Sequence, residues 1–178
     1  MIRKLLVANR GEIAVRIIRT CKEMGITTVA VHSVGDKEAL HVNLADESIC
    51  IGPDNPLKSY LNMNNIIQAA CSSGCDAIHP GFGFLSENPK FAKLVEECGL
   101  IFVGPNHELI SMLGDKNEAR LQMGIIGVPV IPGSKDVIET AEIGLQEAEK
   151  IGYPVIIKAS SGGGGKGMRI VWNSSDFV

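Results

Sequence analysis

The sequence has few aromatic residues, no long apolar run and no strong excess of either charge. Aromatic residues make up 4% of the 178 residues and apolar residues 45%, so aliphatic side chains must build the core. A net charge of −3 supplies no basic face for a nucleic acid. No apolar run approaches the roughly 20 residues that span a bilayer, and the apolar stretch near Met1 is too short for a secretory signal. We therefore expect a soluble, cytoplasmic protein with no nucleic-acid and no membrane partner.

The sequence also lacks a CxxC pair, although it contains five cysteines. They are Cys21, Cys50, Cys71, Cys75 and Cys98. Cys71 and Cys75 are four residues apart, but no histidine stands at a matching ligand spacing. We expect small buried apolar side chains at these positions rather than disulfides or zinc ligands.

The first 105 residues contain a regular alternation of strand-like and helix-like segments. Short apolar, β-branched runs alternate with stretches whose apolar residues recur at helical spacing and end at glycine. The expected strands are residues 4–8, 27–32, 48–52, 76–81 and 100–105, and the expected helices are residues 12–24, 62–74 and 86–99. This order predicts an open, doubly wound α/β domain with a parallel sheet over residues 1–105.

The pattern changes after residue 105. Residues 106–134 have helical stretches and no strand, so they are interpreted as a helical connector. Residues 135–178 then begin a second α/β unit, with the expected elements being a helix at 140–152 and strands at 153–159 and 168–172. Two strands and one helix form a poor independent fold, so this unit is expected to be incomplete.

The glycine-rich stretch Ser160–Met168 fails two familiar phosphate-binding patterns. A Walker A loop needs a hydroxyl residue after the lysine, but Gly167 follows Lys166. A dinucleotide fingerprint needs a helix after its glycines, but a strand is expected there. A hairpin loop whose backbone N–H groups bind phosphate is favoured, with Lys158 and Lys166 adding positive charge. The alternative is a turn that lets two strands pair, although a hairpin needs only about two to five residues.

Three other stretches have both a functional and a structural interpretation. Gly11 follows the first strand, and a strand-to-helix turn is favoured over cofactor binding because the other fingerprint glycines are absent. Residues 77–88 follow a strand where α/β sheets bind ligands, but a turn and a helix capped by Ser86 explain them equally well. Lys116, judged from its neighbours alone, is an ordinary surface lysine.

Several motifs together, in this order, resemble the N-terminal portion of the biotin carboxylase family, which is of the ATP-grasp type. The motifs are VANRGEIAVRIIR, HPGFGFLSEN, FVGP, GDK, GVPVIPGS and GYPVIIKASSGGGGKGMR. The resemblance covers essentially the whole chain. It implies a pre-ATP-grasp α/β domain over residues 1–105, the helical connector 106–134, and the start of a truncated ATP-grasp lid subdomain over 135–178. A similar module occurs in acetyl-CoA, pyruvate, propionyl-CoA and urea carboxylases.

The resemblance also implies an activity and a nucleotide site. Family members use ATP and bicarbonate to make carboxyphosphate, and then carboxylate biotin on a carrier protein or domain. By resemblance, Lys116 and Lys158 contact the ATP phosphates, Gly164 and Gly165 belong to the loop that closes over them, and Met168 lies near the nucleotide. Mg and biotin complete the site in the full enzyme. A mobile glycine lid would exclude water from the reactive intermediate.

The resemblance places the turn within residues 77–88 on the biotin and bicarbonate side of the cleft. Phe82 stands where many members carry tyrosine, so this position has no phenol hydroxyl. The family's magnesium ligands, general base, and bicarbonate- and biotin-binding arginines lie beyond Val178. We therefore assign no catalytic and no metal-binding residue, and expect this chain alone to be inactive. A eukaryotic parent would place it in the mitochondrial matrix instead of the cytoplasm.

Two other functions stay open. Another ATP-grasp ligase, of the carbamoyl-phosphate or purine-pathway type, would share the glycine loop and lysines but not the two N-terminal motifs together. A non-catalytic dimerisation module is the other alternative. The helix at 12–24 carries Arg19 and Glu23 at a spacing typical of a solvated surface pair. In the carboxylase family this helix face resembles part of a homodimer contact.

Overall fold

A computed structural model describes the chain except for Lys135, residues 159–166 and Val178, and it omits the side chain of Lys116. The chain divides into a first unit, Met1–Gly114, and a second unit, Asp115–Val178. The finer division of the chain at residues 105 and 134 stays a prediction.

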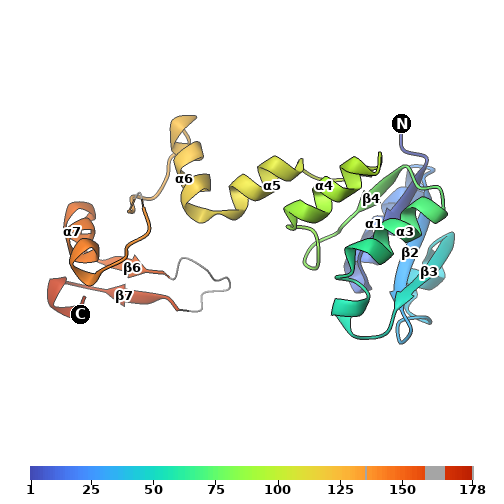
Figure 1. The fold of residues 1–178 in the computed structure, drawn as a ribbon, viewed down its shortest axis with the longest axis horizontal. Helices are drawn as coiled ribbons and strands as arrows, with labels where there is room; N and C mark the ends of the chain where they lie inside the picture. Colours follow the sequence, from blue (N-terminus) through green and yellow to red (C-terminus); the bar gives the residue numbers. More distant parts are fainter. Residues whose placement is uncertain (135, 159–166, 178) are drawn as a thin grey trace. The chain divides into compact units, whose positions relative to one another are not determined.

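The first unit is built on a five-stranded sheet with the strand order β3-β2-β1-β4-β5 (Figure 1). Its strands are β1 (Lys4–Val7), β2 (Thr27–Ser33), β3 (Glu47–Gly52), β4 (Ala77–His79) and β5 (Ile101–Phe102). All four pairings are parallel. The predicted doubly wound parallel sheet is therefore confirmed, and the direction of winding changes between β1 and β4.

Apolar side chains cover both faces of this sheet, as a parallel sheet between helices requires. The helices of the first unit are α1 (Gly11–Glu23), α2 (Leu40–Leu44), α3 (Met63–Ser72), α4 (Pro89–Glu97) and α5 (His107–Gly114), with a 3₁₀ turn η1 (Pro56–Lys58). Leu5 and Val7 of β1 pack in one core cluster with the buried face of α1. Leu6 points to the other face, where it joins the cluster of α3 and α4. Residues of a strand alternate between faces, so β1 contributes to both cores.

Two local predictions for the first unit were incomplete or wrong. The short elements α2 and η1 were not predicted, because they have too few residues to show a periodic pattern. Ser86 does not cap the following helix. Asn88 caps α4, and its side-chain oxygen accepts hydrogen bonds from the N–H groups of Lys90 and Phe91 at 3.0 and 3.1 Å. The backbone N–H of Ser86 instead donates to Gly83 within the preceding turn.

The cysteines divide into two groups. Cys21 and Cys75 are buried, as predicted. Cys50, Cys71 and Cys98 are exposed, so the prediction that they are buried was wrong. Cys50 lies on the edge strand β3, and Cys98 is the residue at which α4 ends, so neither position has a covering layer. All five thiols are free in the structure.

The second unit contains two helices and a two-stranded sheet. Its elements are α6 (Lys116–Ile125), α7 (Ala141–Ile151), β6 (Val155–Ile157), β7 (Arg169–Val171) and a 3₁₀ turn η2 (Ser174–Asp176). The two strands pair antiparallel, with Ile156 opposite Ile170, which confirms the predicted hairpin pairing. Of the residues predicted to share one face of the helix at 140–152, Ala148 is buried, Leu145 is partly buried, and Ala141 and Ile151 are exposed.

None of the helices in the described part of the chain is long and apolar enough to cross a bilayer.

Candidate functional site

A pocket of about 360 Å³ lies in the first unit where the winding of the sheet changes direction. Its walls are residues 9–13, which follow β1, and residues 82–84, which follow β4. We call it the switch-point pocket. The carboxyl ends of β1 and β4 diverge here because their following segments pass to opposite faces of the sheet, and open α/β sheets bind ligands at such points. The pocket therefore coincides with one of the stretches that the sequence singled out.

Asn9 joins the two walls of the switch-point pocket. Its buried side-chain amide donates to the carbonyls of Pro80 at 2.7 Å and Phe82 at 2.8 Å. Its carbonyl oxygen accepts from the N–H of Arg10 at 2.9 Å. One side chain thus satisfies backbone groups on both sides, which fixes the distance between the end of β1 and the turn after β4.

Gly81 lies so close to Asn9 that a larger residue would require Asn9 to shift. A Cβ atom at Gly81 would lie 2.7 Å from the amide nitrogen of Asn9, and the backbone has a φ of +68°. The N–H of Gly81 donates to Nδ1 of His79 at 3.0 Å. Burial lowers the pKa of His79, so its ring is neutral at pH 7 and Nδ1 is free to accept. The hydrogen bond to His79 and the close approach to Asn9 explain why His79 and Gly81 stand at these positions. Neither contact requires the imidazole to take part in a reaction.

Arg10 is held from behind the pocket wall by a chain of polar contacts. Its guanidinium Nη2 lies 2.7 Å from Oδ1 of Asp36. The other carboxylate oxygen of Asp36 accepts from the Tyr60 hydroxyl at 2.6 Å. The same hydroxyl accepts from the N–H of Ser33 at 3.1 Å. Burial, reinforced by the hydrogen bond to Asp36, raises the pKa of Tyr60, so the phenol stays protonated and donating.

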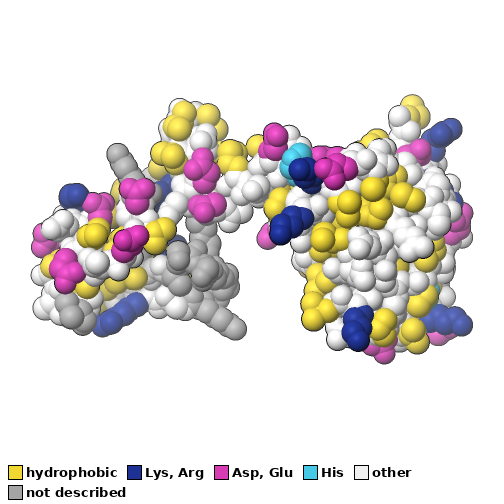
Figure 2. All heavy atoms as spheres, viewed as in Figure 1, with side chains coloured by type: hydrophobic (Ala, Val, Ile, Leu, Met, Phe, Trp, Pro, Cys, Tyr) yellow, Lys and Arg dark blue, Asp and Glu magenta, His cyan; other side chains and the backbone are white. Residues whose placement is uncertain are grey.

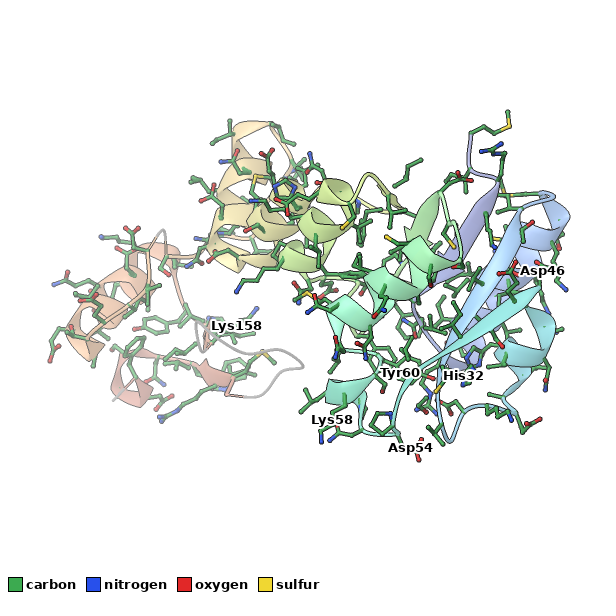
Figure 3. The ribbon with its side chains drawn as sticks, turned by 45° about the vertical axis from the view of Figure 1, so that its right-hand side comes forward. His32, Asp46, Asp54, Lys58, Tyr60 and Lys158 are labelled. Carbon is green, nitrogen blue, oxygen red and sulfur yellow. The ribbon has the colours of Figure 1, made fainter. Side chains whose placement is uncertain are left out.

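Tyr60 also contacts the opposite wall through its ring. The rings of Tyr60 and Phe84 are stacked, with centroids 5.1 Å apart and planes 9° apart. The guanidinium carbon of Arg10 lies 5.7 Å from the centroid of the Tyr60 ring, within range of a cation–π contact. Phe84 has a φ of +43°, a left-handed conformation that is rare outside glycine. Figure 3 labels Tyr60 beneath the sheet's carboxyl edge, close to His32.

The remaining residues of the sequence motif at 77–88 are less involved. Phe82 lines the pocket and is 60% exposed, so its ring is available to a ligand. Ser86 and Glu87 do not line it. Gly11 has a φ of +63° at the start of α1, as expected for the turn it was predicted to make, and it also lines the pocket.

The hairpin of the second unit holds two of the residues predicted to bind nucleotide. Lys158 follows β6 and Met168 precedes β7, each one residue beyond the last pair, Ile157 and Arg169. The antiparallel register therefore brings Lys158 and Met168 opposite one another. Lys158 is exposed, and Met168 is 52% exposed. Figure 3 labels Lys158 at the end of the strand.

These two residues share a face with apolar side chains. Alternation along the strands places Ile156 and Ile170 on one face, and carried to the flanking residues it places Lys158 and Met168 there too. Ile156 and Ile170 are both 54% exposed. Val171, on the other face, is fully buried. The hairpin thus presents an open apolar surface with a cation at one end, which suits a ligand with a flat apolar part and an anionic part.

Of the other predicted nucleotide residues, the structure places the backbone of Lys116. Lys116 is the first residue of α6, directly after the N-cap Asp115, whose carboxylate accepts from two backbone N–H groups at 2.9 Å. Gly164 and Gly165 lie outside the described residues. Within the described part of the chain, no group of three or more His, Cys, Asp or Glu side chains is arranged to hold a metal ion.

Sequence reasoning missed four residues of the switch-point pocket and its support. Asn9 and Arg10 adjoin Gly11, on which the interpretation of that motif concentrated, and an asparagine directly after a buried strand was the available signal. Asp36 and Tyr60 gave no signal, because they lie 26 and 50 residues from Arg10 along the chain and meet it only through the fold.

Comparison with known proteins identifies the family of each part of the chain. The family described as "Biotin carboxylase, N-terminal domain" matches residues 1–110, and the family "Carbamoyl-phosphate synthase L chain, ATP binding domain" matches residues 115–178. The chain is 56% identical over 178 residues to biotin carboxylase 1 of Bacillus subtilis, covering 100% of this chain and 40% of that protein. It is 52% identical over 173 residues to the mitochondrial propionyl-CoA carboxylase alpha chain of Sus scrofa, covering 97% and 24%.

Solved structures give the same result. The biotin carboxylase of Campylobacter jejuni, in complex with a β,γ-ATP compound, matches with a TM-score of 0.92 and 48% identity, covering 99% of this chain and 40% of that one. The biotin carboxylase domain dimer of the Hydrogenobacter thermophilus 2-oxoglutarate carboxylase, with MgADP, ADP and bicarbonate, matches with a TM-score of 0.90 and 49% identity, covering 99% and 39%. Residues 1–110, well over half of the chain, match one family, and the chain belongs to the biotin carboxylase family by its N-terminal domain.

The chain spans about 40% of the length of the bacterial biotin carboxylases that it matches. The second matching family is named after carbamoyl-phosphate synthase, which was the type proposed as an alternative. That match covers only residues 115–178, whereas the relatives that align with the whole chain are biotin carboxylases. The first unit therefore distinguishes this chain from a ligase of the carbamoyl-phosphate type.

Proposed function

We propose that this chain forms the N-terminal α/β domain and part of the nucleotide site of an ATP-dependent biotin carboxylase. This ligase uses ATP and bicarbonate, with Mg, to form carboxyphosphate and then carboxylates biotin on a carrier protein or domain. The observation that carries the proposal is the hairpin surface of the second unit, where the Lys158 ammonium stands at the end of an apolar face that ends at Met168. The match of the first unit to the biotin carboxylase family supports the same function.

The residues of this chain fit a nucleotide. A base can pack on the exposed apolar side chains of the hairpin, and fixed cations can counter phosphate charge. Lys158 and Lys116 would bind phosphate oxygens, Met168 would contact the base, and Gly164 and Gly165 would contribute backbone N–H donors. When bound, Mg would neutralise phosphate charge. The described residues offer no acidic cluster for it, so we place none of its ligands in this chain.

The switch-point pocket would serve the part of the reaction that involves biotin and bicarbonate. Its position after β1 and β4, its exposed Phe82 and its Arg10 side chain suit the biotin and bicarbonate side of the cleft. A homodimer is proposed as the assembly, since a related domain was solved as a dimer. The cytoplasm is the proposed compartment, or the mitochondrial matrix for a eukaryotic parent.

Nucleotide titration by calorimetry tests the proposed ATP site. Lys158→Ala is expected to weaken ATP binding by roughly tenfold, as the loss of one charge-assisted hydrogen bond would. Lys150→Ala is the matched control, because Lys150 is an exposed lysine of the same unit that pairs with Glu147 on α7. Equal affinity in the Lys158 variant and the control would contradict the phosphate assignment.

A turnover assay tests the proposed reaction. We expect no bicarbonate-dependent ATP hydrolysis with free biotin from the 178-residue chain. We expect activity from a chimera in which this chain replaces the matching segment of the Bacillus subtilis relative. Turnover by the chain alone would show that it carries a complete site. An inactive but folded chimera would contradict the proposed reaction, and ATP titration and sedimentation would then show whether the chain binds nucleotide or only dimerises.

A further inference from the structure

Burial alone does not explain why residue 60 is a tyrosine and not an apolar residue. It is 1% exposed and yet carries a hydroxyl, which an apolar core does not need. The hydroxyl is satisfied by Asp36 and Ser33, and the ring is stacked on Phe84. Through Asp36 it reaches Arg10 in one wall of the switch-point pocket, and through Phe84 it reaches the other wall.

We propose that Tyr60 and Asp36 are positioning residues of the switch-point pocket, which hold Arg10 and Phe84 in the orientation that the pocket needs to accept its ligand. Neither residue lines the pocket itself. They act through Arg10 and Phe84, which are lining residues. We call Arg10, Asp36, Tyr60 and Phe84 together the relay. These residues come from the end of β1, the loop after β2, the segment before α3 and the turn after β4.

The ion pair between Arg10 and Asp36 determines the orientation of the Arg10 side chain more than it contributes to the free energy of unfolding. Arg10 is 49% exposed, and an ion pair with one exposed partner contributes little to the free energy of unfolding. Asp36, at 16%, is much less exposed than its partner. A carboxylate fixed by the Tyr60 hydroxyl can, however, hold a planar guanidinium in one orientation. The half-exposed cation is thereby held at the pocket instead of sampling solvent.

The Phe84 branch supports a strained backbone. A non-glycine residue at a φ of +43° is unfavourable unless its surroundings enforce the conformation. The Tyr60 ring packs flat against Phe84, and Phe84 also packs on the core cluster of α3 and α4. Such strained residues occur where a turn must present its backbone in one way to a ligand. Here the strained residue is the last of the turn 82–84 that forms the second wall.

Amide NMR spectra of the 178-residue chain test this relay directly. Tyr60→Phe keeps the ring and its stacking surface but removes the hydroxyl, and Asp36→Asn removes the charge that holds Arg10. Thr28→Val is the matched control, because it also removes a hydroxyl that donates to a carboxylate, Asp46, at 2.8 Å. That bond lies at the amino end of β2, opposite the pocket.

We expect both relay variants to shift the amide signals of residues 10–13 and 82–84, whereas Thr28→Val leaves those signals in place. Shifts limited to Ser33 and residues 59–61, with residues 10–13 and 82–84 unchanged, would overturn the proposal, and so would equal shifts from the control. A Tyr60 variant that does not fold leaves Asp36→Asn, which truncates no side chain, to decide. This result does not depend on which ligand the pocket binds.

A kinetic test in the full-length chimera addresses the ligand, and this part rests on the proposed function. If the pocket lies on the biotin side, Tyr60→Phe is expected to raise the KM for free biotin by roughly tenfold, because a displaced wall weakens positioning. The KM for ATP should stay within about twofold of its value in the parent chimera. A twofold change is smaller than the roughly tenfold change that the loss of one hydrogen bond produces. A loss of stability alone would lower kcat and leave both KM values unchanged, which would contradict the positioning role.

The two failures are distinguishable. An inactive parent chimera would count against the proposed function, while the NMR shifts would still confirm or refute the relay. An active parent chimera with unchanged KM values in Tyr60→Phe and Asp36→Asn would refute the relay and leave the proposed function intact.

Discussion

The two units of the chain are built from similar elements but differ in how much they bury. The first unit has two apolar cores, one on each face of a five-stranded sheet. In the described part of the second unit, Ala148 and Val171 are the only buried apolar side chains. Figure 2 shows acidic and hydrophobic side chains interspersed on the surface of the second unit. Secondary structure alone therefore does not supply a core, because a two-stranded sheet is too small to bury both of its faces.

This difference predicts separate unfolding transitions. Trp172, the one tryptophan of the sequence, directly follows β7 and is therefore a probe of the second unit. Circular dichroism reports mainly the first unit, which holds five of the seven α-helices that the structure describes. We expect the Trp172 fluorescence transition in urea to precede the circular dichroism transition. Coincident transitions would show that the two units unfold together and would break the comparison.

The largest effect is expected from truncation in the core of the first unit. Phe91 is fully buried and packs edge-to-face on Phe102, with ring centroids 6.1 Å apart. Phe91→Ala should lower the free energy of unfolding of the first unit by about 3–5 kcal/mol through the cavity it leaves. The Trp172 transition should not move. Phe82→Ala is the control, since Phe82 is 60% exposed and its loss should change stability by less than about 0.5 kcal/mol.

The next effect is expected at the turn that closes the switch-point pocket. Gly81→Ala should destabilise the first unit by about 1–3 kcal/mol because of strain at a positive φ, added to the contact with Asn9. Gly83→Ala shares the backbone cost, with a φ of +66°, but a Cβ there meets no atom within 4 Å. The difference between the two variants in urea denaturation isolates the contact with Asn9. Equal losses would mean that Asn9 moves aside without cost.

A pH effect should be confined to the first unit, since all four histidines lie within residues 1–114. Burial lowers the pKa of His41 and of His79 in the folded protein. The unfolded chain then binds more protons than the folded one as pH falls, so the stability from these groups is complete above about pH 6.5 and is lost as pH falls toward the lowered values. The circular dichroism midpoint should fall from pH 7.5 to 5.5 while the Trp172 midpoint changes less.

His41→Gln identifies the source of this pH effect. Nε2 of His41 lies 3.2 Å from the carbonyl of Val31, and a glutamine amide can donate from a similar position without titrating. The variant should show a shallower dependence of the midpoint on pH. An unchanged slope would assign the acid sensitivity in this pH range to His79.

The smallest effect is expected at the helix N-caps, where one capping residue of the first unit can be compared with one of the second. Asn88 accepts from two N–H groups at the start of α4, whereas Thr140 accepts from one, at 3.4 Å, at the start of α7. Asn88→Ala should cost about 1 kcal/mol and Thr140→Ala about 0.5 kcal/mol, each in the transition of its own unit. The reverse order would mean that the second unit depends more on local structure than its geometry indicates.

The sequence predicted the strands and longer helices of the first unit because each has a periodic apolar pattern and a glycine at or near its end. It also located one stretch of the switch-point pocket, residues 77–88, by its position after a strand. It did not predict that Asn88 caps α4 in place of Ser86. Both are good capping residues, and only the turn geometry, in which the N–H of Ser86 bonds to Gly83, decides between them.

The sequence by itself determined the class of the fold, the antiparallel hairpin and the family, because these depend on local periodicity and on motifs in a fixed order. The tertiary structure alone decided which residues support the switch-point pocket. Arg10 and Phe84 lie in stretches that the sequence singled out, but Asp36 and Tyr60, which connect them, gave no signal in their own segments. They meet because parallel strands bring their carboxyl ends to one edge of the sheet, where side chains from separate loops come within contact distance.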